Sequence, residues 1–370
     1  MKKFMLKQTI HWFSSVKEFA DSFGIGRGDL LFCNRHFLRD YFDSLNLDCD
    51  VISPGDYGSG EPDDDLVNAI CADISGRHER IIAVGGGTVM DVAKLFALKY
   101  TSPAADLFSG SLDIIRDKKL VLVPTTCGTG SEVTNISILT LNGLHTKKGL
   151  AVDELYPDDA VIIPELLEKL PFGAFATSSI DALVHSVESS LSPKANDVTR
   201  MFAYKAMGMI LNGYKVIAAD GPDARLPLIN DFLSAANYAG ISFGNAGNGA
   251  VHALSYPLGA AFHVPHGESN YAMFTGVMKN YMELKQDGEI ASVNAYIAGI
   301  LGCRTDNVYE ELEKLLNHIV PKKALHEYGM TREQIPEFTD SVLANQQRLL
   351  ANNFTELDRD RIMKIYTELF

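Results

Sequence analysis

Positive charge is scarce in this sequence. Its 370 residues include 33 Lys and Arg against 47 Asp and Glu, which gives a formal net charge of −14 at pH 7. Nucleic acids and anionic membrane surfaces are bound by clustered cations, so this balance excludes both as partners. A small anionic substrate needs only one or two local cations and is compatible with the composition.

Paired cysteines and long apolar runs are also missing. No C-x-x-C occurs, and the cysteines are odd in number and scattered: Cys33, Cys49, Cys71, Cys127 and Cys303. This usage predicts a reduced, cytoplasmic protein with free thiols rather than a disulfide scaffold. No apolar run reaches the roughly 20 residues that a membrane helix needs. Lys7, Gln8 and His11 interrupt the N-terminal stretch, which is therefore not expected to be a signal peptide.

The first part of the chain alternates short apolar runs with amphipathic stretches. Residues 63–76 have apolar positions at helical spacing and acidic residues at their start. Short apolar runs, typical of buried parallel strands, occupy residues 30–34, 51–54, 80–84, 119–124 and 160–164. The alternation predicts a doubly wound α/β domain with a mainly parallel sheet over residues 1–164.

The pattern changes after residue 164. Apolar residues then recur at spacings of three and four, as in residues 198–217 and 306–319. We therefore expect an all-helical second domain over residues 165–370. The active site is expected in the cleft between the two domains.

Two loops have the composition of phosphate-binding segments. IIAVGGGTVMDVAK (residues 81–94) is an apolar run, three glycines and a helix start, where free N–H groups and the helix dipole favour an anion. The segment is neither G-x-G-x-x-G nor a P-loop, and a tight strand-to-helix turn is the structural alternative. LVLVPTTCGTGSEVTN (residues 120–135) leads another apolar run into a loop of small hydroxyl residues, which can bond a phosphate or an amide.

Four side chains have the chemistry of a metal site. Asp181 and His185 are four residues apart in a helical-looking stretch and share one helix face. His252 and His266 are separated by a proline and a glycine, which predict a break that returns the second histidine to the first. One carboxylate and three imidazoles suit a divalent transition metal, although each pair alone is common in proteins without metal.

The order of these motifs resembles the iron-containing (group III) alcohol dehydrogenase family. GGGTVMDVAK, PTTCGTGSEVT, D-A-L-x-H and H-A-x-x-x-P-L-G with P-H-G follow one another as in that family, and the resemblance covers nearly the whole chain. HTKKGLAVDELY, HVPHGESNYAMFTGVM and QQRLLANN resemble its 4-hydroxybutyrate dehydrogenases.

The resemblance implies specific roles. Asp181, His185, His252 and His266 match the family's metal ligands, for iron(II) or, in some members, zinc. The residues that match its NAD-binding positions are Asn34, Gly86, Gly87, Thr88, Asp91, Thr125, Thr126, Thr129, Ser131 and Lys148. For Lys148, the alternative is an ordinary surface lysine.

Two positions depart from the family pattern. Asn34, followed by Arg35, stands where many members have an Asp that favours NAD over NADP, although the 4-hydroxybutyrate subgroup favours NAD. Tyr256 stands where the family often has a His that relays a proton, and its phenol has an unperturbed pKa of ~10. His263 is the candidate for that relay or for binding a substrate carboxylate, and a histidine without a role is the alternative.

The expected activity is hydride transfer between NAD(H) and a small primary alcohol, namely 4-hydroxybutyrate, with succinate semialdehyde as the aldehyde. A divalent metal would lower the pKa of the alcohol and polarise the aldehyde. The alternatives are a dehydrogenase for an uncharged alcohol or diol, a lyase like dehydroquinate synthase, and a non-catalytic metal- or nucleotide-binding protein. A homo-oligomer is also expected. Candidates to bind the substrate carboxylate, by placement or type alone, are His263, Tyr256, Asn245 and Arg348.

Overall fold

The computed structural model describes residues 3–58, 60, 62–144 and 146–370. The chain forms two compact units. One comprises Leu6–Leu170, and the other comprises Pro171–Phe370 together with the N-terminal residues through Met5. The expected boundary at residue 164 lies at the start of a short 3-10 turn, Pro164–Leu167, just before the division at Leu170.

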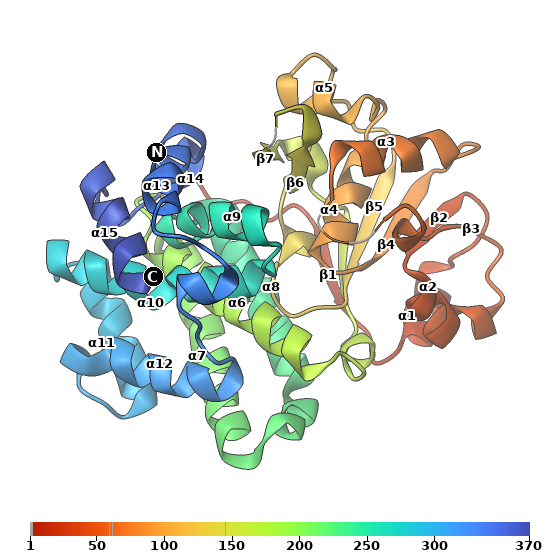
Figure 1. The fold of residues 1–370 in the computed structure, drawn as a ribbon. Helices are drawn as coiled ribbons and strands as arrows, with labels where there is room; N and C mark the ends of the chain where they lie inside the picture. The colour runs from red at the N-terminus through yellow and green to blue at the C-terminus, as the bar shows by residue number, and fades with distance from the viewer. Residues whose placement is uncertain (1–2, 59, 61, 145) are drawn as a thin grey trace. The chain divides into compact units, whose positions relative to one another are not determined.

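The first unit is built on a six-stranded sheet, coloured red to yellow in Figure 1. Its order is β1-β8-β5-β4-β2-β3, and every pairing is parallel. The strands are β1 (Thr9–Trp12), β2 (Asp29–Cys33), β3 (Asp50–Ile52), β4 (Arg80–Gly85), β5 (Lys119–Pro124) and β8 (Asp159–Ile162). The helices between them include α1 (Val16–Phe23), α2 (Arg35–Phe37), α3 (Asp64–Asp73), α4 (Gly87–Phe96) and α5 (Ala104–Ser109). The predicted parallel α/β fold is confirmed.

Three strands of this unit were not predicted. Strand β1 has only four residues, alternates polar and apolar side chains, and pairs with β8 at the edge of the sheet, Thr9 opposite Asp159. Strands β6 (Ile136–Leu141) and β7 (Thr146–Ala151) form a separate antiparallel pair. Strand β7 (TKKGLA) has few apolar residues, and the apolar residues of β6 (ISILTL) are interrupted by Ser137 and Thr140, so neither is a continuous apolar run.

The second unit is helical, as predicted. In Pro171–Phe370 the structure describes every residue, and none lies in a strand. The main helices, green to blue in Figure 1, are α6 (Phe172–Leu191), α7 (Asp197–Asp220), α8 (Ile229–Ala246), α9 (Ala250–Phe262), α10 (His266–Leu284), α11 (Glu289–Leu301), α12 (Val308–Ile319), α13 (Gln334–Asn345), α14 (Gln347–Leu350) and α15 (Arg359–Leu369). Helix α6 is buried without interruption over residues 179–191, and it packs against α7, α8 and α10. It is therefore the centre of this unit.

The N-terminal residues belong to the helical unit rather than to the α/β domain expected from residue 1. The Asn245 side chain on α8 accepts from the Met5 N–H at 2.6 Å and donates to the Met5 carbonyl at 3.0 Å. Phe4 stacks on Phe202 of α7. Asn245, a candidate for substrate binding, thus uses its amide to anchor the chain terminus.

The expected chain break at Pro257 and Gly259 is wrong. Helix α9 continues through Pro257 to Phe262. The reversal comes at His263, which caps α9 in a left-handed conformation with φ of 52°, and α10 begins three residues later, directly after Pro265. Packing of α9 against α10 and α13 maintains the helix despite the N–H that proline lacks.

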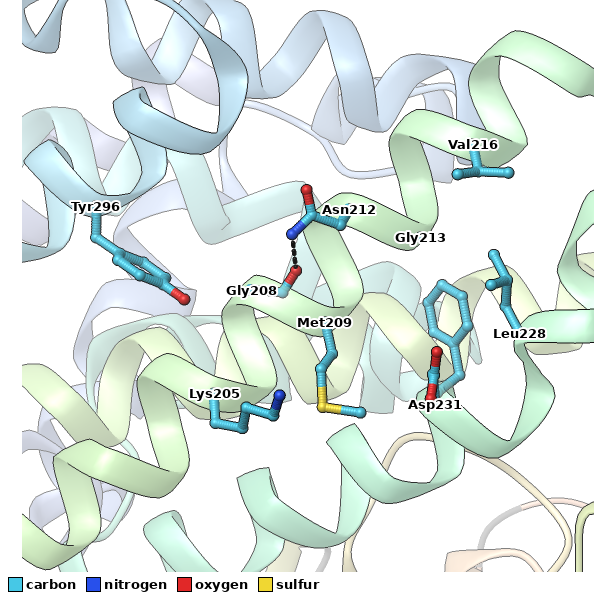
Figure 2. Close-up of a pocket in the computed structure, with 10 residues that line it drawn as sticks. Lys205, Gly208, Met209, Asn212, Gly213, Val216, Leu228, Asp231 and Tyr296 are labelled. Carbon is cyan, nitrogen blue, oxygen red and sulfur yellow. Dashed lines mark hydrogen bonds between the residues drawn. The ribbon is translucent and has the colours of Figure 1, made fainter.

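The surface of the helical unit also carries an open hollow of about 370 Å³ beside α7 and α8 (Figure 2). Lys205, Met209 and Asp231 line it, and Asn212 donates within α7 to the Gly208 carbonyl at 2.8 Å. None of the expected site residues lines this hollow. Among the described residues, no helix combines the length and apolar character needed to cross a membrane.

Candidate metal centre and cofactor loops

The four expected metal ligands converge in the helical unit. Asp181 and His185 lie one turn apart on α6, His252 lies in the first turn of α9, and His266 begins α10. Their ligand atoms all lie within 4.8 Å of one another. Asp181 Oδ1 is 3.8 Å from His185 Nε2, 3.8 Å from His252 Nε2 and 3.7 Å from His266 Nε2. Three of the side chains are buried, and His266 is half-buried.

A glycine permits this convergence. A Cβ atom at Gly267 would lie 2.0 Å from the Thr177 carbonyl oxygen and 3.3 Å from Asp181 Cβ. Any larger residue would therefore push the start of α10 away from α6. The P-H-G sequence thus combines a helix start at Pro265, a ligand and the close approach that brings the ligand to Asp181.

Neighbouring groups fix the histidine rings. His252 Nδ1 lies at hydrogen-bond distance, 2.5 Å, from Glu188 Oε2, and the second Glu188 oxygen accepts from the Val251 N–H at 2.7 Å. The His185 ring stacks between His252, with a centroid distance of 4.7 Å, and Phe243, at 4.2 Å. These contacts limit ring rotation before any ligand binds.

Asn270 lies directly beside the cluster. Its Nδ2 atom is 2.7 Å from Asp181 Oδ1 and 3.2 Å from Nε2 of both His252 and His266. Its Oδ1 atom accepts from Ser255 Oγ at 2.5 Å.

Sequence reasoning missed these supporting residues, although helical spacing carried a signal. Asn270 follows His266 by four residues, Ser255 follows His252 by three, and Glu188 follows His185 by three. Each therefore lies on the same helix face as a cluster histidine.

The cluster favours an ionised Asp181. Burial alone would raise the pKa of this carboxyl, but His185, His266, His252 and the Asn270 amide together hold the pKa below its ordinary value. One carboxylate oxygen and three imidazole nitrogens that face one another in a buried site fit a divalent transition metal such as iron(II) or zinc.

The two proton-relay candidates differ in placement. The Tyr256 ring lies 6.0 Å from the His266 ring, next to the cluster. His263 is exposed at the left-handed end of α9. A left-handed backbone conformation costs energy at a residue other than glycine. Its presence at His263, three residues before the cluster residue His266, therefore suggests a functional reason for this residue.

In the α/β unit, the GGG segment opens helix α4. Gly86 is the N-cap and no side chain caps the helix, so its first N–H groups are open to an anion. A Cβ atom at Gly87 would lie 2.7 Å from Thr129 Cγ2, and one at Gly86 would lie 3.4 Å from Thr126 Cγ2. The two predicted cofactor loops therefore pack against each other, which gives Gly87 a steric role independent of phosphate. Thr88 is exposed, and Thr126 and Thr129 are half-buried.

Other expected cofactor residues face inward. Asp91 accepts from Ser131 Oγ at 2.6 Å and from the Ile138 N–H at 3.1 Å, and Thr125 is buried. Lys94 is fully buried and donates to Ser131 Oγ at 2.6 Å and to the Ile136 carbonyl at 2.7 Å. Asp91, Ser131 and Lys94 thus tie the second loop and β6 to α4. Lys94 was overlooked, although it ends the GGGTVMDVAK motif.

Asn34 lies at the end of β2, where its side-chain oxygen accepts from the Gly55 N–H at 3.0 Å. Its neighbour Arg35 forms a two-pronged pair with Asp56, with both contacts at 2.7 Å. Lys148 on β7 is exposed, and its ammonium donates to the Phe108 carbonyl of α5 at 2.7 Å.

Both parts of the chain match models of one protein family. Residues 13–164 match iron-containing alcohol dehydrogenase, and residues 175–370 match the C-terminal part of the Fe-containing alcohol dehydrogenase family. The chain belongs to the iron-containing alcohol dehydrogenase family. The resemblance inferred from the motifs is thereby confirmed, and so is the expectation of an oxidoreductase.

Individual relatives cover all or most of this chain. The chain is 47% identical over 371 residues to a 4-hydroxybutyrate dehydrogenase of Clostridium kluyveri, covering 100% of both chains. It is 32% identical to long-chain-alcohol dehydrogenase 1 of Geobacillus thermodenitrificans, covering 90% of this chain and 84% of that one. Its fold is similar to the crystal structure of sulfoacetaldehyde reductase from Bifidobacterium kashiwanohense in complex with NAD+, with a TM-score of 0.86, 24% identity and coverage of 100% and 98%.

Proposed function

We propose that this iron-containing alcohol dehydrogenase interconverts 4-hydroxybutyrate and succinate semialdehyde with NAD(H). The observation that carries the proposal is the 47% identity, over the full length of both chains, to the 4-hydroxybutyrate dehydrogenase of Clostridium kluyveri. The convergence of Asp181 with three histidines supplies the chemistry that such a reaction needs.

In this proposal Asp181, His185, His252 and His266 hold iron(II), with zinc as the alternative. When bound, the metal supplies Lewis acidity that favours the alkoxide form of the alcohol and polarises the aldehyde carbonyl. Asn270 orients the Asp181 carboxylate by donating to Oδ1. Tyr256 and Phe243 place aromatic rings against cluster histidines, which supports a substrate space shielded from water.

Transfer of the hydroxyl proton and binding of the substrate carboxylate each require a group outside the metal ligands. We assign one of these two roles to His263. Its position at the C-terminal end of α9 leaves the ring exposed, and an imidazole can both accept and donate a proton. The phenol of Tyr256 is the other candidate.

For the cofactor, the N–H groups at the start of α4 and the dipole of that helix would hold the pyrophosphate of NAD. Gly86, Gly87, Thr88, Thr126 and Thr129 surround that position. The preference for NAD over NADP rests on Asp56, because it already neutralises Arg35, the cation that could otherwise bind a 2′-phosphate.

Steady-state oxidation of NADH with a panel of aldehydes tests the substrate. After loading with iron(II) or zinc, kcat/KM for succinate semialdehyde should exceed that for butanal and propanal, because only the acid offers a carboxylate to a polar partner. Equal or greater values for butanal would favour the second candidate, a dehydrogenase for uncharged alcohols. The aromatic rings beside the cluster and the long-chain-alcohol relative favour that alternative.

We also propose that the enzyme acts in the reducing cytoplasm as a homo-oligomer. None of the five cysteines, all of which the structure describes, forms a disulfide, and this agrees with a reducing compartment. Light scattering after gel filtration would measure the association state, and a monomeric mass would exclude the oligomer.

A further inference from the structure

We propose that Glu188 is a positioning residue that sets the tautomer of His252 and aims its Nε2 atom into the metal centre. This inference rests on the proposed metal function of the cluster. Glu188 itself is outside the four-residue set.

Each oxygen of the Glu188 carboxylate has one polar neighbour. Oε2 lies 2.5 Å from His252 Nδ1, and Oε1 accepts from the Val251 N–H at 2.7 Å. The side chains of Glu188 and His252 are each 2% exposed. A buried carboxylate is costly unless its oxygens accept hydrogen bonds, so this site is stable only when Nδ1 carries the proton.

The opposite edge of the ring gives the same assignment. His252 Nε2 lies 3.2 Å from Asn270 Nδ2, and an amide nitrogen can only donate. Ser255 fixes the orientation of that amide, because its hydroxyl donates to Asn270 Oδ1 at 2.5 Å. Asn270 Nδ2 has two hydrogens, one directed at Asp181 Oδ1 and the other shared between Nε2 of His252 and of His266. Both neighbours of His252 therefore favour a lone pair on Nε2, the nitrogen that faces Asp181. A metal binds an imidazole only through such a lone pair.

Helix α6 carries both two of the cluster residues and Glu188. Glu188 follows Asp181 by seven residues and His185 by three on α6, so a single face carries two cluster residues and the support for a third. The turn before α9 is also held, because Asn352 of the QQRLLANN segment donates to the Asn248 carbonyl at 2.9 Å. That contact gives the QQRLLANN motif a structural role beside the cluster.

The arrangement makes glutamine a poor substitute for Glu188. Both neighbours, Val251 N–H and His252 Nδ1–H, are donors, and an amide offers only one acceptor atom. Either orientation of the amide in Glu188→Gln would therefore place two donors against each other or force His252 into the other tautomer. In the second case Nε2 would carry a hydrogen toward the metal position.

The test is metal affinity, measured for zinc by competition with a chelator, together with the visible absorption of the cobalt(II)-loaded protein. Glu188→Gln should bind zinc about 10- to 100-fold more weakly than the wild type and should change the cobalt spectrum. Affinity for NADH should be unchanged. The matched control is Ser189→Ala, because Ser189 is buried one residue away on α6 and bonds Ser242 instead of a cluster residue. It should keep wild-type affinity and spectrum.

Each outcome bears on a different claim. A wild-type protein that binds neither zinc nor iron(II) would overturn the proposed function, whereas wild-type affinity and spectrum in Glu188→Gln would overturn only the role of Glu188. If the glutamine variant does not fold, Glu188→Asp decides. Its shorter carboxylate cannot reach both neighbours, so this variant should bind zinc more weakly than the wild type, and unchanged affinity would reject the inference.

Discussion

Lys94 in the α/β unit and Glu188 in the helical unit are both fully buried charged residues behind a candidate site. The Lys94 ammonium donates to two hydroxyls and a backbone carbonyl, spread over residues 131–136, and lies 3.3 Å from Asp91. The Glu188 carboxylate instead accepts from one histidine ring and the adjoining N–H. Lys94 therefore supports a stretch of backbone, whereas Glu188 supports one side chain.

This difference reflects how the two sites are made. The cofactor loops would bind phosphate through backbone N–H groups at a helix start. Many separate contacts hold these loops in position. The metal centre depends on the direction of individual nitrogen and oxygen atoms. Single substitutions should therefore damage the metal centre specifically, while damage to the cofactor loops should be accompanied by loss of stability.

His252→Ala should have the largest effect. Removing one of four ligands should lower metal affinity and reduce turnover by about 10³-fold or more, because the Lewis acid supplies several kcal/mol. NADH binding, followed by fluorescence, should persist. His318→Ala is the control, since His318 is exposed on α12 and its ring bonds the Lys314 carbonyl of the same helix. Full metal content and activity in His252→Ala would refute the ligand assignment.

Lys94→Met should show the opposite pattern. It leaves the Asp91 carboxylate without its buried cation, which should cost about 3–5 kcal/mol of unfolding free energy. NADH affinity should fall and zinc affinity should not. Urea unfolding and fluorescence titration measure these effects beside Lys99→Met, which removes an exposed lysine. Unchanged stability would show that Lys94 does not hold the loop.

Gly87→Val should weaken NADH binding by about 10²-fold, because its side chain would enter the space beside the helix start. Zinc affinity should be retained. A double variant separates two reasons for the glycine, namely contact with Thr129 and approach of the phosphate. Gly87→Ala combined with Thr129→Gly removes the clash with Thr129 but keeps the added Cβ at position 87. Higher NADH affinity in the double variant than in Gly87→Ala alone would mean that loop packing, rather than phosphate approach, requires the glycine.

His263→Gly separates stability from function at one position. Glycine relieves the left-handed backbone, so the variant should gain about 0.5–1 kcal/mol of unfolding free energy. If His263 relays a proton, kcat should fall about 10²-fold for both succinate semialdehyde and butanal. If it binds the substrate carboxylate, only kcat/KM for the acid should fall. Wild-type kinetics with both aldehydes would remove His263 from the site and leave Tyr256 or water.

The smallest effect is expected for Asp56→Asn. Freeing Arg35 from its exposed ion pair should raise the NADPH to NADH ratio of kcat/KM by a few-fold, because exposed pairs contribute little energy. Combining it with Arg35→Ala should remove the gain. An unchanged ratio in Asp56→Asn would mean that Arg35 does not reach the cofactor.

Local patterns in the sequence determined much of this protein. The apolar runs of β2, β4 and β5 predict buried parallel strands, because a strand covered on both faces has no polar alternation. The helical spacing of Asp181 and His185 predicts a shared face, and the motif order identifies the family. These features depend on residues near one another in the chain, so they can be predicted from the sequence before the structure is known.

Only the tertiary structure decided the rest. The four residues of β1 become a strand through pairing with β8, and Pro257 stays inside α9 because packing outweighs one lost hydrogen bond. Glu188 meets His252 across 64 residues, and Lys94 meets Ser131 across 37. A buried charge is stable only where distant groups complete its hydrogen bonds, and those partners are known only once the chain has folded.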